Sequence, residues 1–414
     1  MSWQMKTLQI SGTAVVAVLF LAAARSVDAA DVSFEKLQLT DRYYCDGIDA
    51  GDIDGDGHVD IVAGPFWYAG PDFKQAHEFY PAVPLKPEES PSNSMFSFLH
   101  DFSGDGKLDI MVLGRVHKHA ASWYENPGDG GLLWDKHFAF ERVRGESPAL
   151  VNLRGDNSRQ VISHWDGRWG WIEPLPKRPR DPWRFVSIGD DEDWPQFYHG
   201  EGVGDVNSDG RPDLLINDGW YEQPAESSPK WKFHRGKFST GRGGAQMFAY
   251  DVDGDGDQDV ISALDGHIWG LAWFEHVKGD DGTITFREHR IMGDRSEEKK
   301  FGVAFSQPHA LELADIDGDG LQDIVCGKRR WAHGPTGDVE PGAAPVVYWF
   351  QLTRSASGEV KFVPHLIDDD SGVGVQISVK DVNGDDRPDV LTASKLGTFV
   401  FLNRPSNLIG NSGR

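Results

Sequence analysis

Six short acidic segments of this sequence have the residue types and the spacing that hold a hard cation. The first of them reads Asp52-Ile-Asp54-Gly-Asp56-Gly-His-Val-Asp60. Carboxylates at its positions 1, 3, 5 and 9, together with the backbone carbonyl of His58, can surround one ion with oxygen atoms. Glycine at position 6 allows the sharp turn between the ligands. Calcium accepts such a cage of about six to eight oxygens, whereas magnesium requires a tighter octahedron, so the segment predicts a calcium site.

The same spacing recurs in five further segments, and we expect up to six structural calcium ions. The predicted ligands, with the backbone carbonyl at position 7, are Asp101, Ser103, Asp105, Lys107 and Asp109; Asp205, Asn207, Asp209, Arg211 and Asp213; Asp251, Asp253, Asp255, Asp257 and Asp259; Asp315, Asp317, Asp319, Leu321 and Asp323; and Asp381, Asn383, Asp385, Arg387 and Asp389. A seventh segment carries Asn152, Arg154 and Gln160 instead and is not expected to bind a metal. Asp386 replaces the usual glycine and predicts a weaker site in the last segment. The alternative is that all of these segments are solvated hairpin turns.

A second group of residues has the chemistry to bind or transform a ligand. Asp46, Glu146, His199 and His309 each stand six residues before an acidic segment. Histidine can exchange protons near neutral pH, and lysine or arginine can stabilise a developing negative charge. The candidate catalytic residues are therefore His199, His309, His267, Lys328 and Arg330. The predicted ligand-binding residues are Asp46, Glu146, His164, Asp166, Asp218, Gln246, Asp265, Gln376 and Lys395.

Simpler explanations compete with these assignments. An isolated histidine at a surface is more often hydrogen-bonded than catalytic, and the run from Lys328 to Arg330 could be a solvated loop. A single metal held by His199, His309 and a carboxylate such as Glu146 is a further alternative, although spacing alone does not bring them together. The sequence contains no nucleophile elbow, P-loop or HExxH motif.

The acidic segments belong to a repeat that must position all of these residues. The repeat starts at residues 52, 101, 152, 205, 251, 315 and 381. Each acidic segment leads into an apolar run, such as Ile61-Val62-Ala63, and then into an aromatic run, such as Trp67-Tyr68. With the run before the acidic segment and a further run after the aromatic one, a unit has four strands, which is typical of a β-propeller. The acidic segments would join strands one and two on one face, so that the candidate ligand residues lie on the opposite face.

The ends of the chain extend this prediction to an all-β, seven-bladed β-propeller. The last unit lacks a fourth strand, whereas residues 32–39 form an orphan strand whose sequence is similar to that of residues 360–367. We expect this N-terminal strand to complete the last blade, because ring closure hides sheet edges. Residues 30–414 would then form one domain.

The pattern D-x-[DN]-x-D-G-x-x-D followed by Ile-Val, as at Asp52 and Asp315, resembles the FG-GAP or VCBS repeats of integrin α-subunit-type seven-bladed propellers. The resemblance covers nearly the whole chain after residue 29 and implies calcium in the loops between the first and second strands. It says little about activity, because propellers host both binding proteins and enzymes. The phrase Gln307-Pro-His309-Ala-Leu and the Trp-Tyr-Glu-Asn strand also resemble propeller proteins that act on sugars, including the propeller part of aldos-2-ulose dehydratase.

The composition and the N-terminal segment of the chain indicate where the protein works and which partners it can bind. The chain has 414 residues, and its 65 acidic against 41 basic side chains give a net charge of −24, so we do not expect nucleic acid as a partner. Cys45 and Cys326 are the only cysteines and do not make a disulfide scaffold. Lys6, the apolar run 14–24 and Val27-Asp28-Ala29 predict a signal peptide over residues 1–29 and hence export to the periplasm or the outside of the cell. No other segment is apolar enough to span a membrane, and we expect a monomer.

Three functions remain open at this level. The first is a calcium-stabilised propeller that binds a ligand, foremost a carbohydrate and next a protein, on the face opposite the calcium loops. The second is a sugar lyase, dehydratase or isomerase with its active site at the channel mouth of the same face. The third is an adhesion or protein-interaction module. The enzyme is favoured if His199, His267, His309 and Lys328 share one pocket at the channel mouth, and it is disfavoured if these residues lie far apart.

Overall fold

The computed structural model describes residues 32–405 except 89–90, 115–119, 129–130, 132, 156–157, 227 and 229. In this part of the chain the only helical segments are a single 3-10 turn, η2 (Arg295–Glu297), and the four-residue helix α1 (Glu298–Phe301). No described helix has the length and apolar character needed to cross a bilayer. The predicted signal peptide, residues 1–29, lies outside the described residues. The fold is all-β, as predicted.

Twenty-eight strands form six sheets, and five of these sheets have four antiparallel strands each. The first three are β2 (Ile48–Gly51), β3 (Asp60–Ala63), β4 (Phe66–Ala69) and β5 (Gln75–Glu78); β6 (Phe96–His100), β7 (Asp109–Leu113), β8 (Ala121–Glu125) and β9 (Asp135–Phe140); and β10 (Leu150–Val151), β11 (Gln160–Trp165), β12 (Arg168–Glu173) and β13 (Arg184–Ser187). The other two are β22 (Pro308–Ala314), β23 (Asp323–Lys328), β24 (Val347–Arg354) and β25 (Val360–Asp368); and β26 (Ile377–Lys380), β27 (Asp389–Ser394), β28 (Gly397–Pro405) and β1 (Val32–Thr40).

The sixth sheet has eight strands and contains two consecutive repeats. Its strands are β14 (Glu201–Gly204), β15 (Asp213–Ile216), β16 (Gly219–Glu222), β17 (Lys232–Arg235), β18 (Met247–Tyr250), β19 (Asp259–Ala263), β20 (Leu271–Lys278) and β21 (Ile284–Met292). The first strands of the two repeats, β14 and β18, pair in parallel at Gly202–Met247 and Val203–Phe248. A Cβ atom on Gly202 would lie 1.9 Å from the Met247 carbonyl oxygen, so glycine permits this close approach. The described residues therefore form six hydrogen-bonded sheets, and the predicted count of seven blades is not confirmed.

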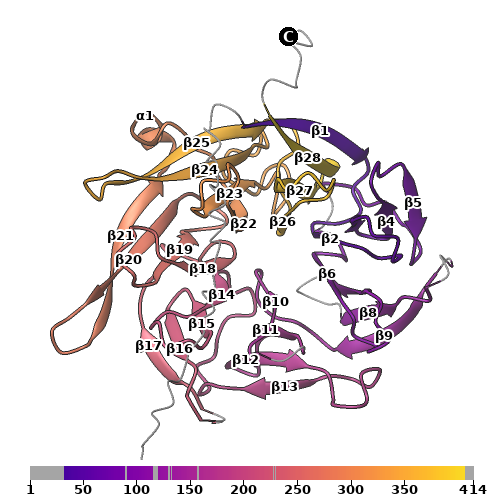
Figure 1. Ribbon diagram of the computed structural model, residues 1–414, viewed down its shortest axis with the longest axis horizontal. Coiled ribbons are helices and arrows are strands. Elements are labelled where there is room, and N and C mark those ends of the chain that lie inside the picture. Colours follow the sequence, from indigo (N-terminus) through magenta and orange to yellow (C-terminus); the bar gives the residue numbers. More distant parts are fainter. Residues whose placement is uncertain are drawn as a thin grey trace, which may run out of the picture.

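The sheets stand side by side around a central axis, with the first strand of each repeat innermost (Figure 1). This arrangement confirms the predicted β-propeller fold. Strand β1 pairs antiparallel with β28, from Val32 opposite Pro405 to Thr40 opposite Thr398. The apolar core lies between neighbouring sheets; in one cluster, Leu271 and Trp273 of one repeat pack with Leu311 and Phe350 of the next.

A recurring pair of rings joins the third and fourth strands of the repeats. The ring centroids of Trp220 and His234 are 4.1 Å apart with an angle of 5° between the planes, and the same histidine contacts Glu222 at 2.6 Å. Stacked pairs of the same kind are Trp67–His77, Trp123–His137, Trp273–His289 and Trp349–His365. These histidines stabilise the blades and lie in the outer strands, away from the channel mouth.

Candidate functional site

The acidic loops join the first and second strands of their repeats and wrap around their own first carboxylate. Asp52 accepts hydrogen bonds from the backbone amides of Gly55 (2.8 Å) and Gly57 (3.1 Å). Asp101 accepts the equivalent bonds in the next loop. Gly55 and Gly57 have φ angles of 79° and 91°, a region that glycine adopts without strain. The carboxylates are thereby turned toward the inside of the loop.

The aspartate at position 9 bonds to backbone amides through both of its oxygens. Asp60 accepts from Ile53 at Oδ2 and from Gly70 at Oδ1, both at 2.8 Å. The same two-sided bonding holds Asp109, Asp213, Asp259, Asp323 and Asp389. Burial raises the pKa of these carboxyl groups, to about 7 for Asp213 and Asp259. Each of these aspartates therefore ties its loop to the third strand of the repeat, a structural role that the sequence did not reveal.

Several acidic loops have the donors that calcium requires. Three carboxylates have oxygen atoms within 4.8 Å of one another in each of three loops, namely Asp52, Asp54 and Asp60; Asp251, Asp253 and Asp255; and Asp315, Asp317 and Asp323. Such all-oxygen groups fit calcium. Basic side chains pair with carboxylates in the other loops, as Lys107 does with Asp105 at 2.9 Å and Arg211 with Asp209. The calcium sites remain predictions.

The loop at residues 152–160 differs from the others as its sequence suggests. Gln160 takes the structural role of position 9, because its Oε1 accepts from the backbone amide of Leu153 at 2.9 Å. Arg154, at position 3, forms an ion pair with the nearly buried Glu173. A positively charged side chain at that position opposes the binding of a cation.

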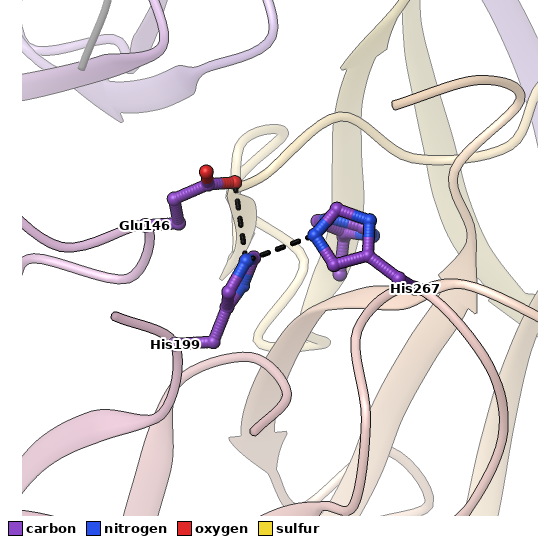
Figure 2. Close-up of side chains that lie close together, drawn as sticks. Glu146, His199 and His267 are labelled. Carbon is purple, nitrogen blue, oxygen red and sulfur yellow. Dashed lines mark hydrogen bonds and ion pairs between the residues drawn. The ribbon is translucent and has the colours of Figure 1, made fainter. Parts of the chain in front are cut away.

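The side chains of Glu146, His199 and His267 point toward one another (Figure 2), and His309 joins them at the ends of the inner strands opposite the acidic loops. One ligand atom from each of the four residues can be chosen so that all lie within 4.8 Å of one another. His199 Nε2 lies 3.0 Å from His267 Nε2 and 3.5 Å from Glu146 Oε2. Two atoms bound about 2.1 Å from one metal are about 3.0 Å apart at an octahedral angle and about 3.4 Å apart at a tetrahedral angle. The observed spacing therefore fits a single metal ion.

The imidazole rings of the three candidate metal-binding histidines are oriented differently from the ring of a neighbouring histidine, His333. The rings of His199, His267 and His309 are nearly perpendicular to one another, at 86°, 76° and 89°, with centroids 4.7–5.5 Å apart. His333 instead stacks on His267 with an angle of 26°. Ring lone pairs lie in the ring plane, so those of stacked rings do not meet at one point. His267, His333 and Asp338 also have ligand atoms within 4.8 Å, but the stacking disfavours a second metal there.

Local features of the backbone orient the side chains of the metal-ligand candidates. His309 lies at a register shift between Pro308 and Ala310 in the pairing of β22 with β23, and such bulges redirect a side chain. Nδ1 of His199 lies 3.3 Å from the carbonyl oxygen of Gly244, which leaves Nε2 for a metal. The backbone amide of Glu146 donates to the carbonyl of Tyr198 (2.7 Å) and so joins two repeats at the site.

Burial favours the neutral form of His267 and His309, which is the form that metals bind. It lowers the pKa of His267 to about 3, with a smaller contribution from His199, and it lowers the pKa of His309 well below the ordinary value. Both ring nitrogens of His309 and Nδ1 of His267 are buried and have no hydrogen-bond partner among the described residues. Bound water or a bound ion can account for such atoms, and both ring nitrogens of His164 and His276 are also buried without a hydrogen-bond partner among the described residues.

A cavity of about 870 Å³ opens beside the cluster. Its lining includes Glu146, His199, His267, Trp194, Phe197, Tyr198, Asp218, Arg242 and His333. The ring of Phe197 is 46% exposed, and Tyr198 donates its hydroxyl hydrogen to Asp218 at 2.7 Å. Aromatic faces can stack on sugar rings, while carboxylates and a guanidinium group can bond to hydroxyls.

The basic residues predicted from sequence do not line this cavity. The Lys328 amine is buried and donates to Ser306 Oγ (2.7 Å), and burial lowers its pKa to about 8. The Arg330 guanidinium lies over the ring of Trp331, 4.5 Å from its centroid, and Lys395 donates to the carbonyl oxygen of Pro87 (2.7 Å). Lys328 therefore does not join the histidines at this cavity, because its amine turns toward Ser306.

Two predicted ligand residues act instead as links between repeats. Gln246 donates to the carbonyl of Val375 (2.9 Å) and accepts from the amide of Leu311 (3.1 Å). Gln376 bonds to both backbone groups of Ser97, each at 3.0 Å. Their amide groups are thus occupied by the inner strands.

Of the other predicted ligand-binding residues, one is buried, one is exposed and one supports a loop of the site. His164 is buried with its ring centroid 5.0 Å from that of Trp169, and burial lowers its pKa to about 3. Asp166 is exposed at the tip of the β11–β12 hairpin. Asp265 accepts from the backbone amide of His267 (2.8 Å) and so supports the loop that carries this metal-ligand candidate.

One residue pair at the site was not assigned from the sequence. His333 Nδ1 lies 2.9 Å from Asp338 Oδ1, and the His333 backbone amide donates to Oδ2 of the same carboxylate. The Asp338 side chain is 1% exposed, which fixes the pair in place. With the Nδ1 hydrogen directed to the carboxylate, Nε2 of His333 is the basic nitrogen. Both residues lie between β23 and β24, but no sequence spacing indicates that they meet.

Comparison with known proteins identifies the repeat. A family model described as FG-GAP-like repeat matches residues 251–326, which include two of the acidic loops. No curated protein matches the sequence. Among solved structures, the chain is similar to an Agrocybe aegerita lectin that specifically recognises non-reducing terminal N-acetylglucosamine; identity is 14% and the TM-score 0.46, over 82% of this chain and 81% of the lectin chain.

Proposed function

We propose that this protein binds a carbohydrate at a divalent transition metal held by Glu146, His199, His267 and His309, and that it acts on the carbohydrate as a lyase or dehydratase. The observation that carries this proposal is the convergence of four ligand atoms within 4.8 Å beside a cavity with aromatic walls. Of the four residues whose convergence would favour the enzyme, His199, His267 and His309 meet while Lys328 does not, and the meeting of the three histidines with Glu146 supports the enzyme.

The donor set supports a transition metal. Three imidazole nitrogens and one carboxylate suit zinc and its neighbours, whereas calcium and magnesium prefer oxygen alone. The molecule would thus separate its cations by chemistry, with calcium in the acidic loops and a transition metal at the channel mouth. A bound metal with an open position supplies a Lewis acid that stabilises negative charge on a substrate oxygen.

Proton transfer is assigned to His333. His199 and His309 were the candidate bases, but a nitrogen bound to a metal cannot also accept a proton. Nε2 of His333 would take the proton from the substrate carbon, the electrons of that C–H bond would form the C=C bond, and the neighbouring hydroxyl would accept the same proton from His333 and leave as water. Asp338 supports this role because its carboxylate orients the ring through Nδ1.

We further propose an exported, calcium-stabilised ring of seven blades in which β1 completes the last blade. Counting the eight-stranded sheet as two blades is supported by its central pairing, which is parallel and extends over two residue pairs. Calcium is supported by the all-oxygen groups in three of the loops. Export rests on the predicted signal peptide.

The proposed function is tested by measuring the zinc content of the protein together with its turnover of sugars. The chain is loaded with Zn²⁺ in excess Ca²⁺, its zinc content is measured, and NMR follows a panel of neutral and acidic sugars for an unsaturated product. We expect one zinc per chain and product formation that is lost in Glu146→Gln. Zinc-dependent sugar binding without product would favour a carbohydrate-binding protein instead, and the absence of both zinc and sugar binding would overturn the proposal.

A further inference from the structure

The segment that joins β13 to β14 forms an aromatic wall of the cavity beside the metal-ligand candidates. Trp194, Phe197 and Tyr198 of this segment all line the cavity. Trp194 packs edge-on against Tyr198, with ring centroids 5.6 Å apart and an angle of 86° between the planes, and Tyr198 is 4% exposed. Phe197 differs from these two residues, because 46% of its surface remains exposed. It is the most exposed aromatic side chain of the wall.

Backbone hydrogen bonds on both sides of Phe197 hold it in place. The carbonyl of Gln196 accepts from the amide of Gly145 (3.4 Å). The carbonyl of Tyr198 accepts from the amide of Glu146 (2.7 Å). The residues that flank Phe197 are therefore tied to the backbone at the metal-ligand candidate Glu146, and the position of Phe197 is fixed relative to the proposed metal site.

The cavity has room for more than one sugar unit. Its volume of about 870 Å³ lies in the upper part of the range for small-molecule sites, which is about 300–1,000 Å³. Phe197 precedes His199 by two residues, so their Cα atoms are at most about 7 Å apart. Both residues line this one cavity. A sugar bound at the metal would therefore leave space beside Phe197 for the neighbouring unit of a sugar chain.

Hydrogen-bond donors line the same cavity. The backbone of Arg242 is held by two hydrogen bonds, from its amide to Asp265 Oδ2 (3.4 Å) and from Asn217 Nδ2 to its carbonyl (3.1 Å). Its side chain is exposed, lines the cavity and forms no hydrogen bond or ion pair with the described residues. An aromatic face together with N–H donors suits a sugar ring, which has apolar C–H faces and a polar edge of hydroxyl groups.

We propose that the cavity takes an oligosaccharide, with one sugar unit at the metal and the next unit stacked on Phe197. Stacking removes the apolar face of a sugar and the exposed aromatic ring from water. A ring whose backbone is already fixed loses little conformational freedom when it binds. This inference rests on the proposed function for the metal and the carbohydrate, and it adds the class of the carbohydrate, namely a chain of at least two units.

Isothermal titration of the full zinc-loaded chain with sugars of increasing length tests this assignment. The probes are glucose, cellobiose and cellotriose; mannose, mannobiose and mannotriose; and galacturonate with its dimer and trimer. We expect the disaccharide of at least one series to bind about tenfold tighter than its monosaccharide. Phe197→Ala should remove most of this gain and leave the affinity for the monosaccharide unchanged. Phe197→Tyr keeps the aromatic face and should retain the gain.

Phe138→Ala is the matched control. Phe138 is 44% exposed, close to the value for Phe197, but it lies on the outer strand β9 and is not among the residues that line the cavity. Its replacement should leave the gain with chain length unchanged. Loss of the gain in Phe138→Ala as well as in Phe197→Ala would contradict a specific role of Phe197.

The outcomes separate this inference from the metal proposal. A wild-type chain that binds neither zinc nor any of these sugars would contradict the proposed function. Binding of zinc and monosaccharides without a gain for longer sugars, or a gain that survives Phe197→Ala, would overturn the stacking site alone. Binding of zinc without any of these sugars would overturn the oligosaccharide and leave the metal site. If Phe197→Ala does not fold, Phe197→Leu also lacks the aromatic face, and a gain that survives in that variant would overturn the stacking.

Discussion

The Nε2 atoms of His199 and His267 lie 3.0 Å apart, although 68 residues separate them in the chain. Only one hydrogen can lie between these two nitrogens, and the Glu146 carboxylate adds a third electron-pair donor 3.5 Å from His199 Nε2. Three electron-pair donors that face one point repel one another unless a hydrogen or a cation lies between them, and one hydrogen can serve only two of the three. This relationship is the main structural reason to expect a metal at the channel mouth.

Calcium should stabilise the fold, and its effect should grow with pH. Burial raises the pKa of Asp213 and Asp259 to about 7 in the calcium-free protein, from an ordinary value of 3.8. A carboxyl group whose pKa is raised on folding stabilises the fold below its unfolded pKa, and this contribution is lost as the pH rises through the folded pKa. The calcium-free protein should therefore lose stability between about pH 4 and pH 7, while calcium should restore it by binding the folded carboxylates. Equal melting temperatures with calcium and with a chelator at about pH 8 would contradict this prediction.

Replacing Lys328 with Met should raise stability at neutral pH. Burial lowers the pKa of this amine from 10.5 to about 8, so the folded state binds its proton less tightly than the unfolded state. Lys328 therefore destabilises the fold below its folded pKa, and this penalty disappears as the pH rises from about 8 to about 10.5. The free energies of unfolding of Lys328→Met and wild type, measured by denaturation, should converge over that range. A constant difference between them would contradict the burial of a charged amine.

Asp386→Gly should stabilise the last acidic loop. Asp386 has a φ angle of 62°, in the left-handed region, at the position where Gly57 occupies the first loop. A residue with a Cβ atom pays about 1 kcal/mol or more there, which glycine avoids. We expect Asp386→Gly to raise the free energy of unfolding by about 1 kcal/mol and to tighten calcium binding at this loop. Gly57→Ala is the matched reverse change, and it should destabilise the protein; equal effects of the two substitutions would contradict the argument.

The sequence predicted the repeat because its chemistry is local. An Asp-Gly loop, an apolar strand and a Trp-containing strand follow one another within a single repeat, so spacing alone indicates a propeller. The same register placed Glu146, His199 and His309 at equivalent points of different repeats. Their convergence depends on how the inner strands are arranged around the axis, which no local pattern specifies.

The sequence alone could not predict the directions in which the side chains at the candidate site point. Lys328, Arg329 and Arg330 are consecutive, and only the structure shows that the Lys328 amine turns to Ser306, that Arg329 is buried and that the Arg330 guanidinium lies over Trp331. The bulge at Pro308 and Ala310 shifts the local register, so strand alternation does not indicate which residue points inward. Gln246 and Gln376 were misassigned for a related reason, because their amide groups fit backbone atoms of neighbouring repeats as well as they would fit a sugar.

X-ray absorption spectroscopy of the zinc-loaded protein in excess calcium tests the central claim most directly. The account predicts one zinc per chain whose first shell contains three imidazole nitrogens and at least one oxygen at about 2.0–2.2 Å. His309→Ala should remove one imidazole and weaken zinc binding, while His333→Ala should leave the shell intact. An all-oxygen shell, or a shell that is unchanged in His309→Ala, would contradict a metal centre formed by Glu146, His199, His267 and His309.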